Sequence, residues 1–336
     1  MLITIIIPVY NVADYVDACL ASVARQTYNT DVECLIIDDK STDNSRYNVE
    51  KFISQYSGPI DFRLILQGEN RGLSATRNTG IMNAKGDYVL FLDSDDEIST
   101  ICLEHLVKPL SKRNYDLVVG GYILKGIDYP VLSNKFDHEY SIESNESIKE
   151  FFVKGKPYVM AWNKLYSKSF LLNNKLTFCE GVIYEDELWS LQVANNAKSM
   201  CLIPSITYFY RIRGNSIMTS INRNIYEKIE KKIIIYALLE DYVLVKNEFD
   251  RILFRYIENK RNNLLNDIYE CRKRVSGKDL YTNLCGFSVY PDYILRNTNL
   301  WSCKVLLRDL HFFLPKGINY YYWLLYRSIH YKFHRK

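Results

Sequence analysis

The residues best suited to do chemistry form a short acidic run, Asp93-Ser94-Asp95-Asp96, directly after the apolar stretch 88–92. Three carboxylates within four residues concentrate negative charge, which is costly unless a cation neutralises it. Carboxylate oxygens suit Mg²⁺ or Mn²⁺, which commonly share their coordination shell with substrate phosphates. Side chains alternate along an extended chain, so Asp93 and Asp95 are expected on one side and Ser94 on the other. The run therefore predicts a divalent-metal site.

Two other apolar stretches also end in polar motifs. Pro8 and Tyr10 close the first of them. Pro8 removes a backbone donor and fixes the turn, and the Tyr10 ring could stack on a nucleotide base. Asp39 closes the second stretch and could accept a hydrogen bond from a base imide, while residues 41–43 could cap the next helix. A turn or capping role is the alternative for each motif taken alone.

Residues 70–80, Asn-Arg-Gly-Leu-Ser-Ala-Thr-Arg-Asn-Thr-Gly, form a glycine-punctuated segment that predicts a loop entering a helix. It brings Arg71 and Arg77 towards the same edge. Helix amino termini and guanidinium groups both favour phosphate. The segment contains neither Gly-Lys-Ser/Thr nor Gly-x-Gly-x-x-Gly, so it does not match the common phosphate-binding loops.

An alternating pattern in the first hundred residues indicates the scaffold that positions these motifs. Short β-rich runs occur at 3–9, 33–37, 62–66 and 88–92, and amphipathic stretches at 13–26, 44–56 and 72–84. This alternation is typical of βαβ units in a mostly parallel sheet, and near-continuous apolar runs are typical of strands covered on both faces. Ligands gather at the carboxyl ends of such strands, where all these motifs lie.

The rest of the chain changes character along its length. A strand is expected at 116–122, followed by a polar, irregular stretch to about residue 143. Beyond residue 222 the pattern turns helical, with apolar residues at helical spacing in 225–244 and 246–274. We therefore place a domain boundary near residue 220.

Composition indicates a soluble globular protein. The chain has 336 residues, 48% of them hydrophobic, and 43 basic against 39 acidic side chains, for a formal net charge of +4. Collagen-like and disordered classes are excluded, and this length allows one large or two moderate domains. The eight cysteines lack the paired spacing of a zinc site, so we expect them to be reduced and mostly buried.

Taken together, the motifs resemble those of the family 2 glycosyltransferases, whose nucleotide-binding domain has the GT-A fold, a Rossmann-like α/β sheet flanked by helices. The resemblance is close over residues 1–100 and looser over 155–220. It implies a GT-A domain at 1–220, with a nucleotide-binding half followed by an acceptor half at 101–220. Residues 221–336 would form a helical C-terminal region with a basic aromatic tail.

The resemblance also implies which residues bind a nucleotide-sugar donor. Pro8 and Tyr10 would lie at a uracil base, with Tyr10 stacked on it, and Asp39 would bond the same base. Arg71 and Arg77 would lie near the diphosphate or the sugar. The implied donor is therefore a UDP-sugar.

The metal and the catalytic base follow from the same resemblance. Asp93-Ser94-Asp95 would be the Asp-x-Asp motif that binds Mn²⁺ or Mg²⁺ and the diphosphate. Asp186 would be the catalytic base, and Glu185 would orient acceptor hydroxyls. An inverting transfer needs such a carboxylate, because the acceptor hydroxyl must lose its proton as it attacks the anomeric carbon. A favourable acidic first turn of a helix is the alternative for these two residues.

Three weaker assignments come from segments similar to bacterial members of the family. Trp162 would stack against a sugar face, although a core position is equally consistent with its type. Arg211 and Arg213 would reach the diphosphate from a closing loop. The Gln-x-x-Arg-Trp motif of processive synthases is absent from the sequence, which favours the transfer of a single sugar.

These inferences predict a metal-dependent, inverting glycosyltransferase that acts on a lipid-linked or oligosaccharide acceptor in surface-polysaccharide assembly. Two alternatives stay open. A nucleotidyltransferase would also place a carboxylate-bound metal on an α/β sheet, but the basic glycine-rich activating loop expected near its amino terminus is missing. A nucleotide-sugar-binding scaffold would bind the donor without turnover.

The C-terminal tail combines aromatic and basic side chains. Residues 301–336 contain seven Lys or Arg and one acidic residue. Such a segment suits the interface of an anionic membrane, and the alternative is a core-packing terminal helix with a solvated basic tail. Nucleic-acid binding is not expected, because no nucleic-acid motif accompanies these residues. Without a leader or an 18-residue apolar span, the protein is expected in the cytoplasm, peripheral to the inner face of the membrane.

Overall fold

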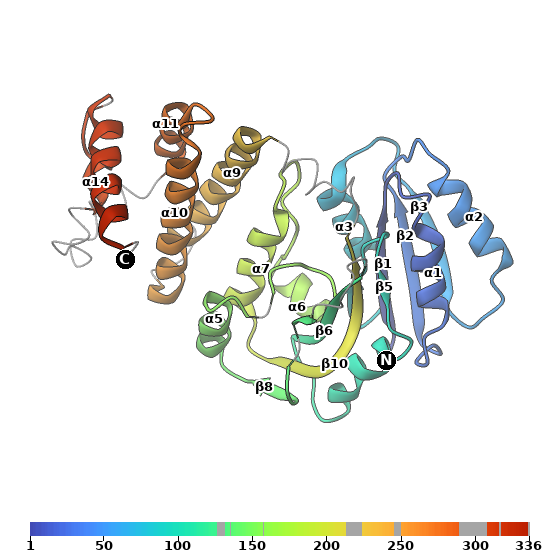
Figure 1. The fold of residues 1–336 in the computed structure, drawn as a ribbon. Helices are drawn as coiled ribbons and strands as arrows, with labels where there is room; N and C mark the ends of the chain where they lie inside the picture. The colour runs from blue at the N-terminus through green and yellow to red at the C-terminus, as the bar shows by residue number, and fades with distance from the viewer. Residues whose placement is uncertain are drawn as a thin grey trace. The chain divides into compact units, whose positions relative to one another are not determined.

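A computed structural model describes the chain except for residues 126–131, 135, 157, 213–223, 245–249, 289–307, 316 and 335–336. Its centre is one mixed β-sheet (Figure 1), with the strand order β3-β2-β1-β4-β9-β6-β10-β5. In addition, β7 pairs with β6, and β8 pairs with β10. The strands are β1 (Ile3–Val9), β2 (Val32–Asp38), β3 (Asp61–Leu66), β4 (Tyr88–Phe91), β5 (Glu97–Ile98), β6 (Leu117–Lys125), β7 (Leu132–Asn134), β8 (Tyr140–Ile142), β9 (Lys164–Ser167) and β10 (Met200–Arg211).

The four strands β3, β2, β1 and β4 are parallel, and β9 is antiparallel to both β4 and β6. The apolar run of β1 explains its central position, because Ile3 and Ile5–Ile7 are fully buried between the layers on the two faces of the sheet. The predicted α/β class with a sheet flanked by helices is confirmed.

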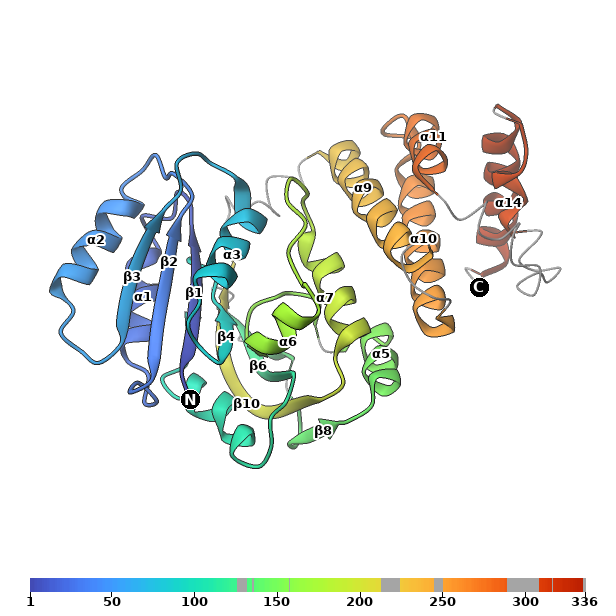
Figure 2. The ribbon, with the colours of Figure 1, turned by 180° about the vertical axis from the view of Figure 1, so that it is seen from behind.

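Helices cover both faces of the sheet (Figure 2). They are α1 (Val16–Ala24), α2 (Ser45–Gln55), α3 (Gly72–Asn83), α4 (Cys102–Val107), the 3₁₀ turn η1 (Lys108–Ser111), α5 (Asn145–Val153), α6 (Lys168–Asn173) and α7 (Glu185–Asn196). The crossovers through α1 and α2 run from β1 towards β3, whereas the crossover through α3 returns past β1 to β4. Right-handed crossovers therefore put α3 on the opposite face from α1 and α2.

The helix α3 approaches β1 very closely. A Cβ atom added to Gly80 would lie 2.4 Å from Cγ2 of Ile6. Only glycine allows this approach without movement of a neighbour. The position of α3, and of the side chains that it carries, therefore depends on this one residue.

One expectation about local structure is wrong. The stretch after residue 122, expected to be irregular, continues β6 as far as Lys125 and includes the short strands β7 and β8. Ser141 in β8 pairs with Cys201 in β10. A strand this short, with its partner sixty residues away along the chain, carries too little local pattern to be recognised.

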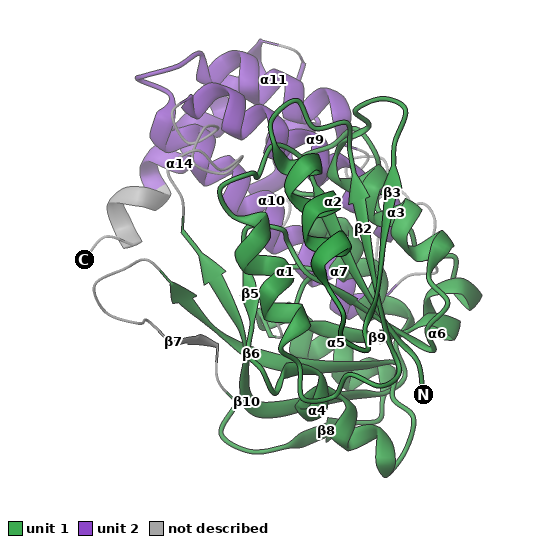
Figure 3. Ribbon diagram, turned by 90° about the vertical axis from the view of Figure 1, so that its right-hand side faces the viewer, with its two compact units in different colours: residues 1–213 green, residues 214–336 purple. Residues whose placement is uncertain are grey.

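The chain divides into two compact units, residues 1–213 and 214–336 (Figure 3). The second unit is helical, as expected, and contains α9 (Ile225–Leu244), α10 (Arg251–Cys271), α11 (Gly277–Phe287), the 3₁₀ turn η3 (Leu310–Phe312) and α14 (Ile318–His334). The start of α10 is fixed by Asp250, whose carboxylate accepts the N–H groups of Ile252 and Leu253. Within the described residues, no helix is long and apolar enough to cross a membrane.

Candidate active site

The site lies where the order of parallel strands reverses, between β1 and its neighbour β4. A crevice outside the carboxyl ends of the strands is expected at such a point. Tyr10 follows β1 and is 46% exposed, as a residue that stacks on a ligand must be. Asp93 follows β4, and Asp39 follows β2. Pro8 is buried within β1, opposite Ile37 of β2, so it shapes the end of the strand.

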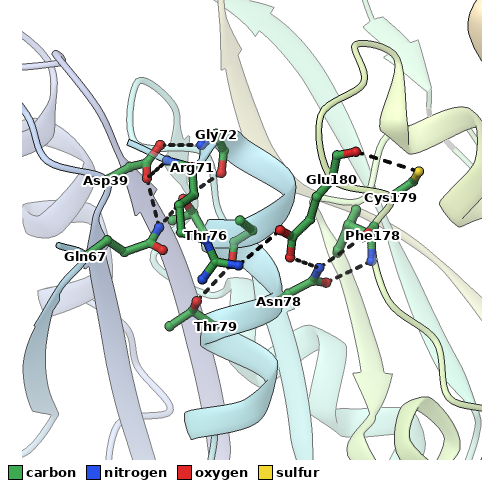
Figure 4. Close-up of polar contacts among 11 residues, drawn as sticks. Asp39, Gln67, Arg71, Gly72, Thr76, Asn78, Thr79, Phe178, Cys179 and Glu180 are labelled. Atoms are coloured by element: carbon green, nitrogen blue, oxygen red, sulfur yellow. Dashed lines mark hydrogen bonds and ion pairs between the residues drawn. The ribbon is translucent and has the colours of Figure 1, made fainter. Parts of the chain in front are cut away.

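The buried Asp39 carboxylate holds the amino terminus of α3 (Figure 4). Its Oδ1 accepts hydrogen bonds from the N–H of Arg71 and from Nε2 of Gln67, at 2.8 and 2.9 Å. Its Oδ2 accepts the N–H of Gly72, also at 2.8 Å. A carboxylate at a helix amino terminus is favourable because it complements the unpaired N–H groups there. Asp39 thus positions α3, and its contact with a nucleotide base stays a prediction.

The other side of α3 is fastened to the segment that leads into α7 (Figure 4). The Asn78 side chain donates to the carbonyl of Phe178 at 3.0 Å and accepts the N–H of the same residue at 2.8 Å. At the start of α3, the half-exposed Arg71 donates to Glu180 at 3.1 Å. These contacts hold residues 178–180, and hence the approach to α7, against α3.

Arg77 lies at the centre of the site, with only 1% of its side chain exposed. Its Nη2 pairs with Asp93 at 2.9 Å, and its Nη1 pairs with Glu185 at 2.9 Å and with Asp186 at 3.1 Å. Burial alone would lower the pKa of Arg77, but the three carboxylates outweigh it and raise that pKa above its ordinary value. The guanidinium therefore stays charged, and it joins the end of β4 to the first turn of α7.

This arrangement separates the two arginines that were expected near the same ligand. Arg71 reaches Glu180 from an exposed position, whereas Arg77 is buried among the site carboxylates. Arg77 therefore acts as a bridge between protein groups in this structure. Its position beside the diphosphate or the sugar stays a prediction.

Asp186 and Glu185 begin α7, directly after Tyr184 in the left-handed backbone conformation (φ 70°). This turn points both carboxylates at Arg77. Burial raises the pKa of Asp186 to about 7, while the Arg77 guanidinium lowers it. A carboxylate with a pKa near neutrality is suited to accept a proton from a substrate hydroxyl.

The acidic run after β4 forms a turn, because the N–H of Asp96 donates to the carbonyl of Asp93 at 3.0 Å. The expected alternation of side chains therefore does not apply. Asp96 points inward and is 1% exposed, with its carboxylate accepting the hydroxyl of Tyr208 at 2.6 Å and the N–H of Arg211 at 2.7 Å. Burial and the negative charges of Asp95 and Asp93 raise the pKa of Asp96 to about 9. Ser94 is also buried.

The residues present fit a divalent cation that shares its ligands with a substrate. Within the described residues, no group of three or more His, Cys, Asp or Glu side chains could by itself hold a metal ion. Asp93 and Asp95 are only partly buried. Mg²⁺ is commonly bound by one or two carboxylates together with waters and substrate phosphates. The two accessible carboxylates match that donor set. They are too few to form a metal site from protein ligands alone.

Trp162 and Arg211 occupy positions set by protein contacts. Trp162 is 2% exposed and stacks on Tyr208, with ring centroids 4.3 Å apart. These contacts favour a core position for Trp162 over stacking against a sugar. Arg211 pairs with Glu97 at 2.6 Å and donates to the carbonyl of Asp95 at 3.2 Å, beside the acidic run. Arg213 lies outside the described residues.

Sequence reasoning missed Lys164, a buried lysine at the start of β9. Its ammonium donates to the carbonyl of Tyr158 at 2.9 Å and to that of Met160, and it lies 4.0 Å from the centre of the Tyr158 ring. Burial lowers the pKa of Lys164 to about 7, while the negative charge of Asp186 raises it. Lysine is rarely buried, so the residue type alone points to the surface.

The comparison with known protein families decides the classification. The family model of Glycosyl transferase family 2 matches residues 4–172, which is half of the chain. The chain belongs to this family. The match contains β1 to β4, the acidic run and Arg77.

Individual relatives agree with this assignment. The glycosyltransferase GlyA of Streptococcus pneumoniae is 34% identical over 226 residues, which cover 64% of this chain and 31% of GlyA. The glycosyltransferase GlyG of the same organism is 28% identical over 84% of this chain and 94% of its own length. TarP of Staphylococcus aureus, a poly(ribitol-phosphate) β-N-acetylglucosaminyltransferase, is 30% identical over 62% of each chain. The matched region thus spans about a third of GlyA and less than two thirds of TarP.

A solved structure supports the fold. Residues 1–349 of S. aureus TarS in complex with UDP-GlcNAc superpose with a TM-score of 0.68 at 19% identity, covering 98% of this chain and 92% of that one. The predicted GT-A fold with a helical C-terminal region is therefore confirmed, as is membership of glycosyltransferase family 2.

Proposed function

We propose that this protein is a metal-dependent, inverting glycosyltransferase that moves one sugar from a nucleotide diphosphate sugar to a saccharide or lipid-linked saccharide acceptor. The observation that carries the proposal is the ion-pair cluster around Arg77, which joins Asp93 of the acidic run to Asp186 on α7. The cluster supports the proposal because it brings the acidic run, the proposed metal site, next to a candidate base whose pKa is raised to about 7.

In this mechanism, Asp186 takes the proton of the acceptor hydroxyl while that oxygen forms a bond to the anomeric carbon of the donor sugar. The bond from the anomeric carbon to the diphosphate breaks, and the nucleoside diphosphate leaves. Glu185 orients the acceptor hydroxyl, and Arg77 holds both carboxylates in place. When bound by Asp93 and Asp95, Mn²⁺ or Mg²⁺ supplies Lewis-acid stabilisation of the departing diphosphate.

Donor recognition is assigned to the ends of the parallel strands. Tyr10 stacks on the base beside Pro8, Asp39 contacts the same base, and Ser94 lies at the diphosphate. The TarS complex with UDP-GlcNAc supports a UDP-sugar as the donor. A second similar structure, the mannosyltransferase PcManGT of Pyrobaculum calidifontis in complex with GDP-Man and Mn²⁺, supports the metal, with a TM-score of 0.55 at 13% identity.

The acceptor and the location follow from the relatives and from the tail. The activity of TarP, a poly(ribitol-phosphate) β-N-acetylglucosaminyltransferase, supports an acceptor in cell-surface polysaccharide assembly. We assign the protein to the cytoplasm, with peripheral contact to the inner face of an anionic membrane through residues 301–336. Nucleic acid is not among the proposed partners.

A thermal-shift panel tests this function. The protein is heated with UDP-linked and GDP-linked sugars, each with and without Mn²⁺, because a ligand that binds only the folded state raises its unfolding temperature. We expect a metal-dependent rise with one UDP-sugar, and loss of that rise in Asp93→Asn and Asp95→Asn. Asp61→Asn, at an exposed carboxylate of β3, serves as the matched control. Folded protein that shows no shift with any donor contradicts the proposal.

A further inference from the structure

The last helix carries a stripe of exposed apolar side chains. Ile318, Tyr321, Leu325 and Ile329 of α14 are each between 51% and 62% exposed. Their spacing of three, four and four residues puts them on one face of the helix. We call these four residues the apolar stripe. A continuous exposed apolar row of this kind marks a surface that binds a protein, a membrane or a ligand.

The opposite side of α14 is fixed within the same helical unit. Trp323 is fully buried, and its ring stacks on Tyr281 of α11 at 4.9 Å between centroids. Ser328 shares a hydrogen bond of 3.0 Å with the hydroxyl of Tyr269 in α10. Because these contacts hold the other face, the apolar stripe cannot rotate into the core without breaking them.

Basic side chains lie beside the stripe, in the turn between α10 and α11 and at the start of α11. Arg272, Lys273, Arg274 and Lys278 lie within seven residues, and the last three are exposed. Lys278 links the turn to the stripe, because its Nζ lies 5.9 Å from the centre of the Tyr321 ring. In the described part of the chain, none of the four forms an ion pair with a carboxylate. We call residues 272–278 the basic turn.

The combination selects one kind of partner. An apolar row bordered by cations that lack carboxylate partners suits a helix lying in the interface of an anionic bilayer, with its apolar side chains among the acyl chains. A second copy of this chain would bring two basic turns together, and like charges across an interface are unfavourable. Each residue of the stripe also belongs to the strongly basic segment 301–336.

We propose that the apolar stripe and the basic turn together form a surface that binds an anionic lipid bilayer, with α14 lying in the plane of the membrane. The proposal rests on the membrane contact assigned to residues 301–336 under the proposed function. It adds the face of the protein that makes this contact. It also brings in residues 272–278, which lie outside the tail.

Vesicle sedimentation tests the proposal with the full chain. The protein is mixed with vesicles of phosphatidylcholine alone or of phosphatidylcholine with phosphatidylglycerol. We expect binding to the phosphatidylglycerol vesicles that is roughly ten-fold stronger than to the neutral ones and that weakens as salt is added. Leu325→Gln/Ile329→Gln and Arg274→Gln/Lys278→Gln are each expected to lose most of this binding.

Met82→Gln/Lys85→Gln is the matched control, since it removes one exposed apolar side chain from the end of α3 and one exposed basic side chain just after it. This variant is expected to bind vesicles like the wild type. Wild-type protein that ignores phosphatidylglycerol vesicles, or stripe and turn variants that bind like the control, overturns the proposal. A wild-type dimer that Leu325→Gln/Ile329→Gln converts to monomer, without vesicle binding, assigns the stripe to a second copy and also overturns it.

The donor thermal shift, measured on the same samples, separates this proposal from the proposed function. If the protein does not bind vesicles but shows the donor thermal shift, the proposed membrane surface is refuted and the proposed function is not. If the protein binds vesicles but shows no donor thermal shift, the proposed glycosyltransferase function is refuted and the membrane surface is not. All substituted side chains are exposed, so thermal melting of each variant is expected to match the wild type.

Discussion

The buried guanidinium of Arg77 is shared by three carboxylates that come from two distant parts of the chain. Removing one partner of a buried ion pair typically costs about 3–5 kcal/mol, because the remaining charge is left without compensation. The three carboxylates therefore depend on Arg77 for their direction, and Arg77 favours the ionised form of Asp186. The residues of the cluster should respond to substitution as a unit.

Replacing the candidate base tests its role directly. Asp186→Asn keeps the shape of the side chain but removes its ability to accept a proton, so we expect transfer to fall by roughly 10²–10⁴-fold. Donor binding should persist, because the acidic run is unchanged. Sugar transfer and the donor thermal shift are measured on the same protein. Near-normal transfer by Asp186→Asn would show that another group is the base.

The pH dependence of transfer tests the link between Arg77 and Asp186. The base must be deprotonated, so kcat/KM should rise with pH through about 7, the pKa of Asp186. Arg77 lowers that pKa, so Arg77→Gln should move the rise to higher pH. Arg77→Lys keeps the positive charge and should restore much of the original profile. An unchanged profile in Arg77→Gln would refute this positioning role.

Sequence reasoning found the acidic run and the Glu185-Asp186 pair because each is a local motif. It could not find what Arg77 contacts, since Arg77 and Asp186 are separated by 109 positions. The turn after β4 was missed for a related reason. Asp96 turns inward to Tyr208, and that partner lies 112 positions away.

At the scale of elements, the contact of α3 with β1 is the most sensitive. Gly80→Ala would put a methyl group against Ile6, and overpacking of this kind costs about 1–3 kcal/mol, partly offset by the better helix propensity of alanine. Because α3 also carries Arg77, transfer should fall as well. Met82→Ala, at an exposed position of the same helix, is the control. Urea unfolding and transfer rates are the measurements, and equal behaviour of the two variants would contradict this account.

The helical unit contains a buried histidine that should make its stability depend on pH. His311 is 1% exposed and bonds the hydroxyl of Tyr281 through Nδ1 at 2.7 Å. Burial lowers the pKa of His311 to about 3, with Arg261, Arg327 and Arg308 lowering it further and Asp309 opposing them. Below pH 6.5 the unfolded chain therefore gains a proton that the folded chain does not bind.

The contribution of His311 to the free energy of unfolding is complete above about pH 6.5 and is lost as the pH falls towards 3. At pH 4 the expected loss is at most about 3 kcal/mol. His311→Gln lacks this titration, so the difference in stability between wild type and variant should shrink on acidification. Denaturant unfolding between pH 7 and pH 4 measures it, and a constant difference would contradict the prediction.

Elements with strong local patterns were predictable. The range 3–9 for β1 and the range 225–244 for α9 are confirmed to the residue, because each has a continuous or helical apolar pattern. The three-residue strand β8 and the four-residue strand β9 have no such pattern. Their existence depends on pairing with strands far away along the chain.

For the whole molecule, the division into two compact units predicts that the donor site belongs to the first. A fragment of residues 1–213 is expected to unfold cooperatively and to show the same metal-dependent donor shift as the full chain, because the predicted donor residues at the strand ends and in α3, from Pro8 to Asp95, all lie within this unit. Circular dichroism and the thermal-shift panel measure this. A folded fragment without a donor shift would show that the second unit contributes to donor binding.

The position of β9 in the sheet bears on how the protein is synthesised. This strand lies between β4 and β6, although residues 164–167 leave the ribosome after both of them. The charge partners of Arg77 on α7 emerge later still. A nascent chain that ends before residue 164 therefore has a gap in its sheet, and one that ends before residue 185 leaves Arg77 without two of its three carboxylate partners. Folding of the first unit should therefore await synthesis of residues 164–186, and pauses before that point expose the edges of β4 and β6 to wrong partners.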